Sequence, residues 1–140
     1  MSFAAARNAI HGALSTGWSA TPLASIHFDN VSFEPPDGDW LRITVEGNTA
    51  RQVSLGPTGQ RRMRRSGLIF IQVFTGAGKG PRDNDDILQA AATALEAQQI
   101  AGNGVTVHTQ AATAPQGGSV EDGYWQRRIT IPFYYDQTGV

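Results

Sequence analysis

The chain has 140 residues, with 11 lysines and arginines against 12 aspartates and glutamates, and no cysteine. This length fits one domain, which can bury a sufficient core without cross-links. Disulfides and thiol chemistry are excluded. A net charge of −1 argues against a dedicated nucleic-acid-binding protein, because such proteins usually carry a basic excess. The chain has no apolar run of about 20 residues and no secretory signal, so we expect a cytoplasmic protein without a membrane partner.

The N-terminal segment predicts an α-helix over residues 2–16. Its apolar residues recur at helical spacing, and Gly17 can end the helix in a left-handed conformation. The residues on this apolar stripe are Phe3, Ala6, Ile10 and Leu14.

Alternation of apolar and polar residues then predicts three strands. The first covers residues 24–30. The next two, 40–47 and 50–56, are separated by Gly47 and Asn48, so we expect them to form an antiparallel hairpin.

The segment LIFIQVF (68–74) is apolar on both faces apart from Gln72. A strand of this kind is typically covered on both sides, so we expect it at the centre of the fold. A second helix is predicted over 84–101. Asp83 can cap its first turn, and Gly102 can end it.

Two further strands are predicted at 105–111 and 124–136. Pro132 lies in the second, and because proline has no N–H group we expect an edge or a bulge there. The predicted order is α-β-β-β-β-α-β-β. It indicates an α+β fold in which two helices pack on one face of a mainly antiparallel twisted sheet, as one domain over residues 1–140.

The sequence contains no short motif that is typical of a phosphate-binding, metal-binding or catalytic site. The segment TGAGKGPRD (75–83) stands where a phosphate-binding loop belongs, but its glycines and hydroxyls do not fit the required spacing. His11, His27 and His108 lack the spacing of metal ligands. No nucleophile motif is present. We therefore expect no catalytic residues, no cofactor, no metal and no enzymatic activity.

Four arginines lie within five positions, directly before the apolar segment 68–74: Arg61, Arg62, Arg64 and Arg65. They fall between two predicted strands, on the tip or the stem of a hairpin. We rank contact with a partner protein first, since the guanidinium fork pairs well with carboxylates at interfaces. A solvated loop that protects a sticky strand comes second, and non-specific DNA contact comes third.

Three segments together resemble the tail terminator-like proteins of long-tailed bacteriophages. They are IHFDNVSFEPPDGDWLRITV (26–45), RQVSLGPTGQRRMRRSGLIFIQVFTGAGKG (51–80) and ITIPFYYD (129–136). The resemblance implies a small α/β subunit that forms a hexameric ring on the tail tube. This ring stops tube polymerisation and joins the head connector, and the genome later passes through its lumen.

The same resemblance implies the partners and the location. The partners are further copies of the chain, the tail tube protein and the head–tail connector or neck protein, with transient, non-specific proximity to genomic DNA. The location is the tail or neck of the virion, after assembly in the host cytoplasm. The candidate interface or lumen residues are Arg61, Arg62, Arg64, Arg65, Lys79, Pro132 and Tyr134.

Two alternatives remain open at this stage. The chain could be a neck, connector or tail-tube subunit of the same particle. It could also be a small nucleic-acid-binding module that uses the arginines at 61–65.

Overall fold

The structure is a computed structural model, and it describes residues 3–17, 24–28, 39–78, 80, 82–102, 104–121 and 123–139. Within these ranges lie two helices and seven strands. They are α1 (Phe3–Gly17), β1 (Ala24–His27), β2 (Asp39–Gln52), β3 (Arg62–Gly76), α2 (Arg82–Leu95), β4 (Gln99–Ala101), β5 (Thr106–Thr109), β6 (Gln116–Glu121) and β7 (Tyr124–Thr138).

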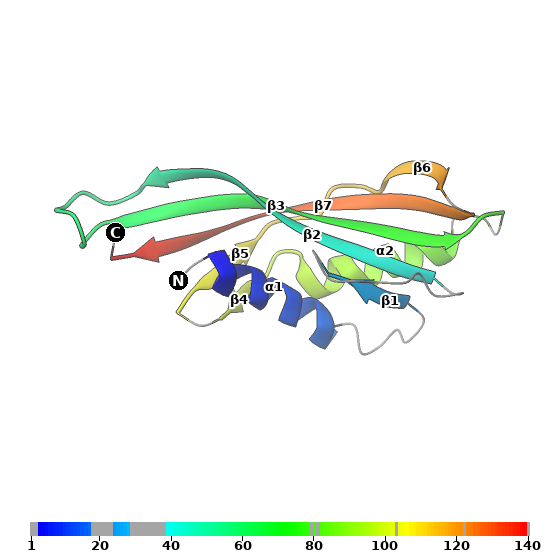
Figure 1. The fold of residues 1–140 in the computed structure, drawn as a ribbon, viewed down its shortest axis with the longest axis horizontal. Coiled ribbons are helices and arrows are strands. Elements are labelled where there is room, and N and C mark those ends of the chain that lie inside the picture. The colour runs from blue at the N-terminus through cyan, green and yellow to red at the C-terminus, as the bar shows by residue number, and fades with distance from the viewer. Residues whose placement is uncertain are drawn as a thin grey trace.

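The strands form one sheet in the order β1-β2-β3-β7-β5-β4, and β6 pairs with β7. The β1–β2 pair is parallel and the other pairs are antiparallel. Both helices lie on the same face of this twisted sheet (Figure 1). The predicted α+β class is therefore confirmed, as is the general order of a helix, a group of strands, a second helix and a closing group of strands.

The predicted hairpin at Gly47 and Asn48 is wrong. Residues 39–52 form one continuous strand, β2, which pairs with β3 along most of its length. The pairing register shifts between Gly47 and Thr49, which marks a β-bulge. A glycine inside an alternating pattern is typical of a bulge as well as of a turn, and the longer β3 provides a partner for both halves of β2.

The second helix ends six residues earlier than predicted, at Leu95. Ala97 adopts a left-handed φ of 53°, which stops the helix before β4 begins. The hydroxyl group of Thr109 donates to the Leu95 carbonyl and accepts the N–H of Gln98 at 2.8 Å. Gly102, the predicted end of the helix, instead lies in the turn between β4 and β5, where its N–H donates to Val105.

The core lies between the sheet and the two helices. On β3, Ile69, Ile71 and Val73 belong to this core and are fully buried. Phe70 and Gln72 alternate with them, so they lie on the opposite face, where they are half-buried. On that opposite face Phe74 is buried and stacks on Trp40. The expectation that a helix covers one face of 68–74 and another group covers the other is therefore confirmed near Phe74, whereas the other face is only partly covered at Phe70 and Gln72.

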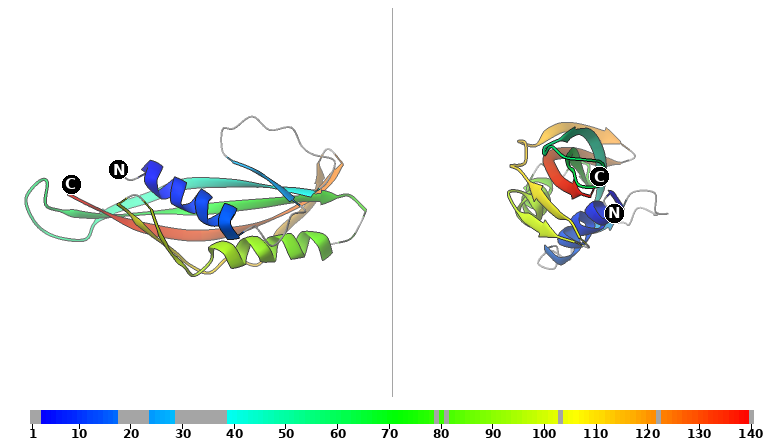
Figure 2. Two further views of the ribbon diagram at one scale, coloured as in Figure 1. Left: turned by 90° about the horizontal axis from the view of Figure 1, so that it is seen from below. Right: turned by 90° about the vertical axis from the view of Figure 1, so that its left-hand side faces the viewer.

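The strands β2, β3 and β7 continue beyond the helices as a three-stranded ribbon, which we call the arm (residues 49–66 and 134–139) (Figures 1 and 2). The arm begins where Gly47 pairs with Gly67. A Cβ atom on Gly67 would collide with the Glu46 carbonyl and would lie 2.8 Å from the Phe133 ring. A Cβ on Gly47 would lie 2.8 Å from the ring of Phe3. Glycine at both positions lets two aromatic rings pack directly on the strand backbones.

The two faces of β3 predict different responses to a buried charge. Ile71→Asp should prevent folding, because its carboxylate would be unpaired in the core. Phe70→Asp should fold, because a half-buried side chain on the open face keeps contact with water. Far-ultraviolet circular dichroism and urea unfolding of the two variants would compare them. Loss of folding in both variants would show that the open face is as essential to the subunit as the helix-covered face.

Candidate interaction surface on the arm

The four clustered arginines lie on the stem of the arm. Arg62, Arg64 and Arg65 belong to β3, and Arg61 precedes it in the loop that joins β2 to β3. The antiparallel pairing places Arg51 of β2 beside Arg64. These side chains therefore divide between the two faces of a ribbon, and the fold gives them different neighbours.

Arg64 links the strands β3 and β7 of the arm through its side chain. Its Nε and Nη2 atoms donate to the two carboxylate oxygens of Asp136 at 2.8 and 3.1 Å. Its guanidinium carbon lies 4.5 Å from the centre of the Tyr134 ring, which stacks in turn on His108 at 4.7 Å. The hydrogen bond between Arg64 and Asp136 raises the pKa of the arginine and lowers the pKa of the carboxyl group. Arg64 and Tyr134 thus join the strands of the arm.

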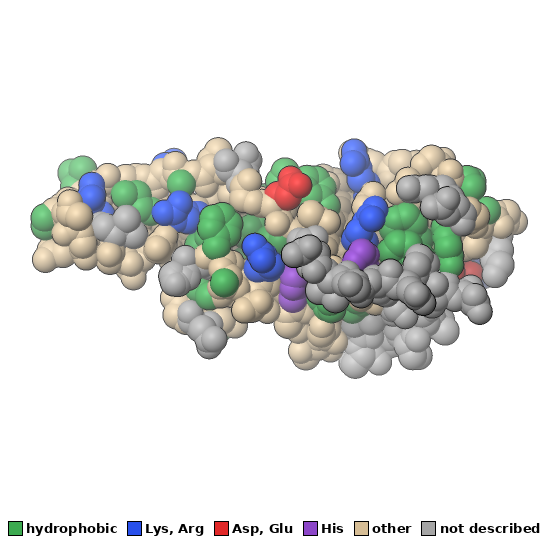
Figure 3. Space-filling model, viewed as in Figure 1, with side chains coloured by type: hydrophobic (Ala, Val, Ile, Leu, Met, Phe, Trp, Pro, Cys, Tyr) green, Lys and Arg blue, Asp and Glu red, His purple; other side chains and the backbone are tan. Residues whose placement is uncertain are grey.

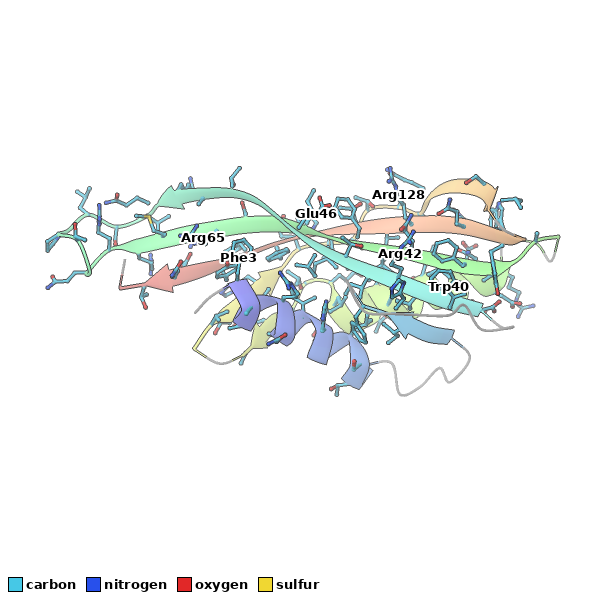
Figure 4. All side chains as sticks on the ribbon, viewed as in Figure 1. Phe3, Trp40, Arg42, Glu46, Arg65 and Arg128 are labelled. Carbon is cyan, nitrogen blue, oxygen red and sulfur yellow. The ribbon has the colours of Figure 1, made fainter. Side chains whose placement is uncertain are left out.

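Arg65 points to the other face of β3, near Phe3 (Figure 4). Its Nε donates to the side-chain oxygen of Gln137 on β7 at 2.7 Å. Arg65, Phe3 and Tyr135 line a hollow of about 370 Å³ at the base of the arm. Tyr135 is 1 % exposed, and burial raises the pKa of its hydroxyl group. Arg65 therefore also contributes to the internal structure of the arm.

The side chains that the arm presents outward are different ones. Arg62 is 48 % exposed, and its Nε lies 3.7 Å from an Asp136 oxygen. Arg51 is exposed on β2. Arg61 donates to the Thr58 hydroxyl at 3.2 Å. Leu55, in the loop at the tip, is 95 % exposed. The sequence analysis missed Arg51 and Leu55. Their exposure results from the projection of the arm beyond the helices, and local sequence gives no sign of that projection.

The remaining predicted residues lie near the base of the arm or outside the described ranges. β7 pairs with β5 at residues 133–134 and with β6 at 124–128, so its outer edge has a gap between them. Pro132 lies in this gap, as expected for a residue without an N–H group, and its carbonyl accepts the N–H of Gln110 at 2.9 Å. Lys79 lies outside the described residues.

Part of the predicted set does come together in space. Arg64, Pro132 and Tyr134 line a hollow of about 510 Å³ on the face of the sheet away from the helices, and Arg51, which was not predicted, lines it with them. Across the described ranges, no three histidine, aspartate or glutamate side chains form a group that could hold a metal ion. Neither described helix is long and apolar enough to cross a membrane.

Charge is distributed unevenly along the molecule. The arm has five arginines, Arg51 included, and one acidic residue, Asp136, which gives a formal charge of +4. Because the whole chain carries −1, the rest of it, which we call the body, carries −5. The face in Figure 3 shows basic side chains on the arm and no acidic one. A basic arm and an acidic body favour contact between the arm and an acidic protein surface.

The ion pair in the arm predicts a shifted titration. A carboxyl group whose pKa is lowered by folding stabilises the protein above its unfolded pKa, about 3.9, and this contribution is lost as the pH falls through the folded value. Asp136 should therefore titrate below about 3.9 in an NMR titration of its carboxyl carbon. In Arg64→Gln the midpoint should rise toward the ordinary value. An ordinary midpoint in the unaltered protein would contradict the pairing.

Comparison with known proteins identifies the family. The sequence model of the phage tail terminator protein family matches residues 5–133, nearly the whole chain. No curated protein gives a significant match. One solved structure has a TM-score of 0.66 and 19 % identity, over 94 % of this chain and 95 % of its own.

A second similar structure comes from the virion of a native gene transfer agent particle. It has a TM-score of 0.54 and 16 % identity, over 97 % of this chain and 96 % of its own. At these identities the two structures show only that the fold is shared. Membership of the family is shown by the sequence model, which matches nearly the whole chain. The resemblance inferred from three segments is confirmed: the chain belongs to the phage tail terminator family and is a structural protein of the phage tail.

Proposed function

We propose that this chain, as one domain over residues 1–140, closes into a ring of six copies that caps the tail tube. The ring stops tube polymerisation and provides the joining surface for the head connector. The genome passes through its lumen without sequence-specific contacts. Family membership over residues 5–133 is the observation that carries this proposal.

The shape of the subunit supports a ring. One end of the molecule is the arm, and the other end carries the start of α2 and the β6–β7 turn (Figure 1). The two ends differ in both shape and charge, so contact between the arm of one copy and the body of the next is head-to-tail. Head-to-tail contacts generate rings when the rotation between neighbours closes.

The internal pairing of the arginines also favours a protein partner over DNA. Arg64 and Arg65 are held by Asp136 and Gln137, which leaves fewer guanidinium groups for phosphates. A ring repeats each weak contact around its circumference, so modest contacts at each arm suffice for a stable assembly. We propose that assembly takes place in the host cytoplasm and that the finished ring stays in the virion.

Imaging tests the proposal directly. Negative-stain microscopy of the purified protein mixed with tail tubes should show single rings at tube ends, and tubes should stop growing when it is added. Analytical ultracentrifugation should show a species of six copies, alone or with tubes. Open-ended tubes of this protein alone would instead identify it as a tube subunit, and a chain that stays monomeric with tubes present would contradict the ring.

Charge reversal on the outer side of the arm should weaken the ring and preserve the fold. In Arg51→Glu/Arg62→Glu, we expect rings to require about tenfold more protein, equivalent to about 1.4 kcal/mol, because the arm would repel an acidic neighbour. The matched control is Arg7→Glu/Arg128→Glu, which changes the formal charge by the same amount at two exposed arginines outside the arm (Arg128 is labelled in Figure 4). Sedimentation at several concentrations measures the difference. Equal loss of rings in the control would assign the effect to net charge and not to the arm.

A further inference from the structure

We infer that the tip of the arm docks into the groove between α1 and α2 of a second copy, with Leu55 as its anchor. This inference rests on the proposed ring and specifies the contact that links its neighbours. It assigns a donor surface and an acceptor surface, which meet at each boundary between neighbouring copies of the ring.

The donor surface is the loop at the tip of the arm, residues 53–60. Leu55 is 95 % exposed, the most exposed of the large apolar side chains of the described residues. Residues 54–60 carry no charge, so the tip is a slender polar and apolar loop in front of a basic stem. The arm points away from the two helices of its own subunit (Figure 2), which leaves Leu55 available to another molecule.

The acceptor surface is a groove of about 730 Å³ where α1, α2 and β4 meet. Small side chains on both helices create it, among them Ala9, Gly12 and Ala94. Ile100 adds a larger apolar side chain, and polar side chains that carry no charge also line the groove: Asn8, Thr16, Thr93 and Gln98. An uncharged, mainly apolar groove suits a tip without charge that carries one leucine, because leucine and groove then bury apolar surface together.

The charges beside the groove are opposite in sign to the charges beside the tip. On α2, Asp86 lies two helical turns before Thr93 on the same side of the helix, about 10 Å along its axis, and Asp83 lies one turn further back. Both aspartates are exposed. On the arm, Arg51 lies four residues before Leu55, at most about 14 Å away along the chain. With Leu55 in the groove and the stem along α2, the arginines of the stem come beside the two aspartates.

The absence of native cysteine allows a direct test by disulfide cross-linking. In the full-length double variant Leu55→Cys/Gly12→Cys, mild oxidation should join copies into covalent chains of up to six subunits on a non-reducing gel. Both positions tolerate the change: Leu55 is exposed, and a Cβ on Gly12 meets no atom within 4 Å. Disulfides form only where the two Cα atoms approach within about 7 Å, so the cross-link reports the docked geometry.

Matched pairs separate the possible results. Leu55→Cys/Ala114→Cys places the second thiol in another surface hollow, beside α2 and β7, and should not give covalent chains. Each single variant should give dimers at most. Cross-linking to position 114 and not to position 12, or to neither, would overturn the groove as the acceptor.

The same samples distinguish this inference from the proposed ring. If sedimentation shows six-copy rings and the Leu55–Gly12 pair stays unlinked, the ring stands and the groove contact is wrong. If no rings form, the proposed ring is wrong, and the contact inferred from it is wrong as well. Leu55→Asp gives an independent measure: we expect a folded protein whose ring formation needs at least tenfold more protein, and unchanged rings would overturn the anchor role.

Discussion

The structure depends on strand pairing that continues past the layer of helices. Every residue of β3 has a partner on β7, but the helices support only part of this ladder. Apart from Tyr135, which belongs to the core, the arm relies on cross-strand side-chain contacts to support its backbone hydrogen bonds. These contacts are the Arg64–Asp136 pair, the Arg65–Gln137 hydrogen bond and the hydroxyl pair of Thr49 and Ser66 at 2.6 Å. The arm can therefore project as an ordered element, although little apolar surface is buried beneath it.

Strand pairing in the arm gives the four clustered arginines different roles. In the sequence, Arg61, Arg62, Arg64 and Arg65 are four similar charges, and each suggests a partner. Alternation along β3 sends neighbouring side chains to opposite faces, and the pairing with β7 supplies Asp136 and Gln137 as internal acceptors. Two of the four arginines thus keep the arm in shape, while Arg62 and the distant Arg51 face outward. A cluster of one residue type in sequence need not be one surface in space.

The sequence could predict what depends on local periodicity. The apolar patterns of α1, of 68–74 and of 124–136 were sufficient to place one helix and the two longest central strands, because side-chain period alone determines their faces. What sequence missed depends on distant partners. The end of α2 is stabilised by Thr109, fourteen residues beyond Leu95. Gly47 forms a bulge instead of a turn because β3 is long enough to pair with both sides of it. The arm residues Arg51 and Leu55 became candidates only once the projection of the arm was visible.

The unpaired edge of the arm bears on the proposed role of the subunit in ending tube growth. Among the described residues, β1 pairs with β2 only as far as Arg42, so the outer edge of β2 is unpaired along the arm. An exposed edge of this length invites another strand, and strand addition has no natural end. The bulge between Gly47 and Thr49 and the charge of Arg51 both disfavour such pairing. A protein that stops growth needs contacts that are used up when a circle closes. Docking between a tip and a groove has that property when the rotation between neighbours closes the circle, because each copy offers one tip and one groove and the closed ring leaves neither unoccupied.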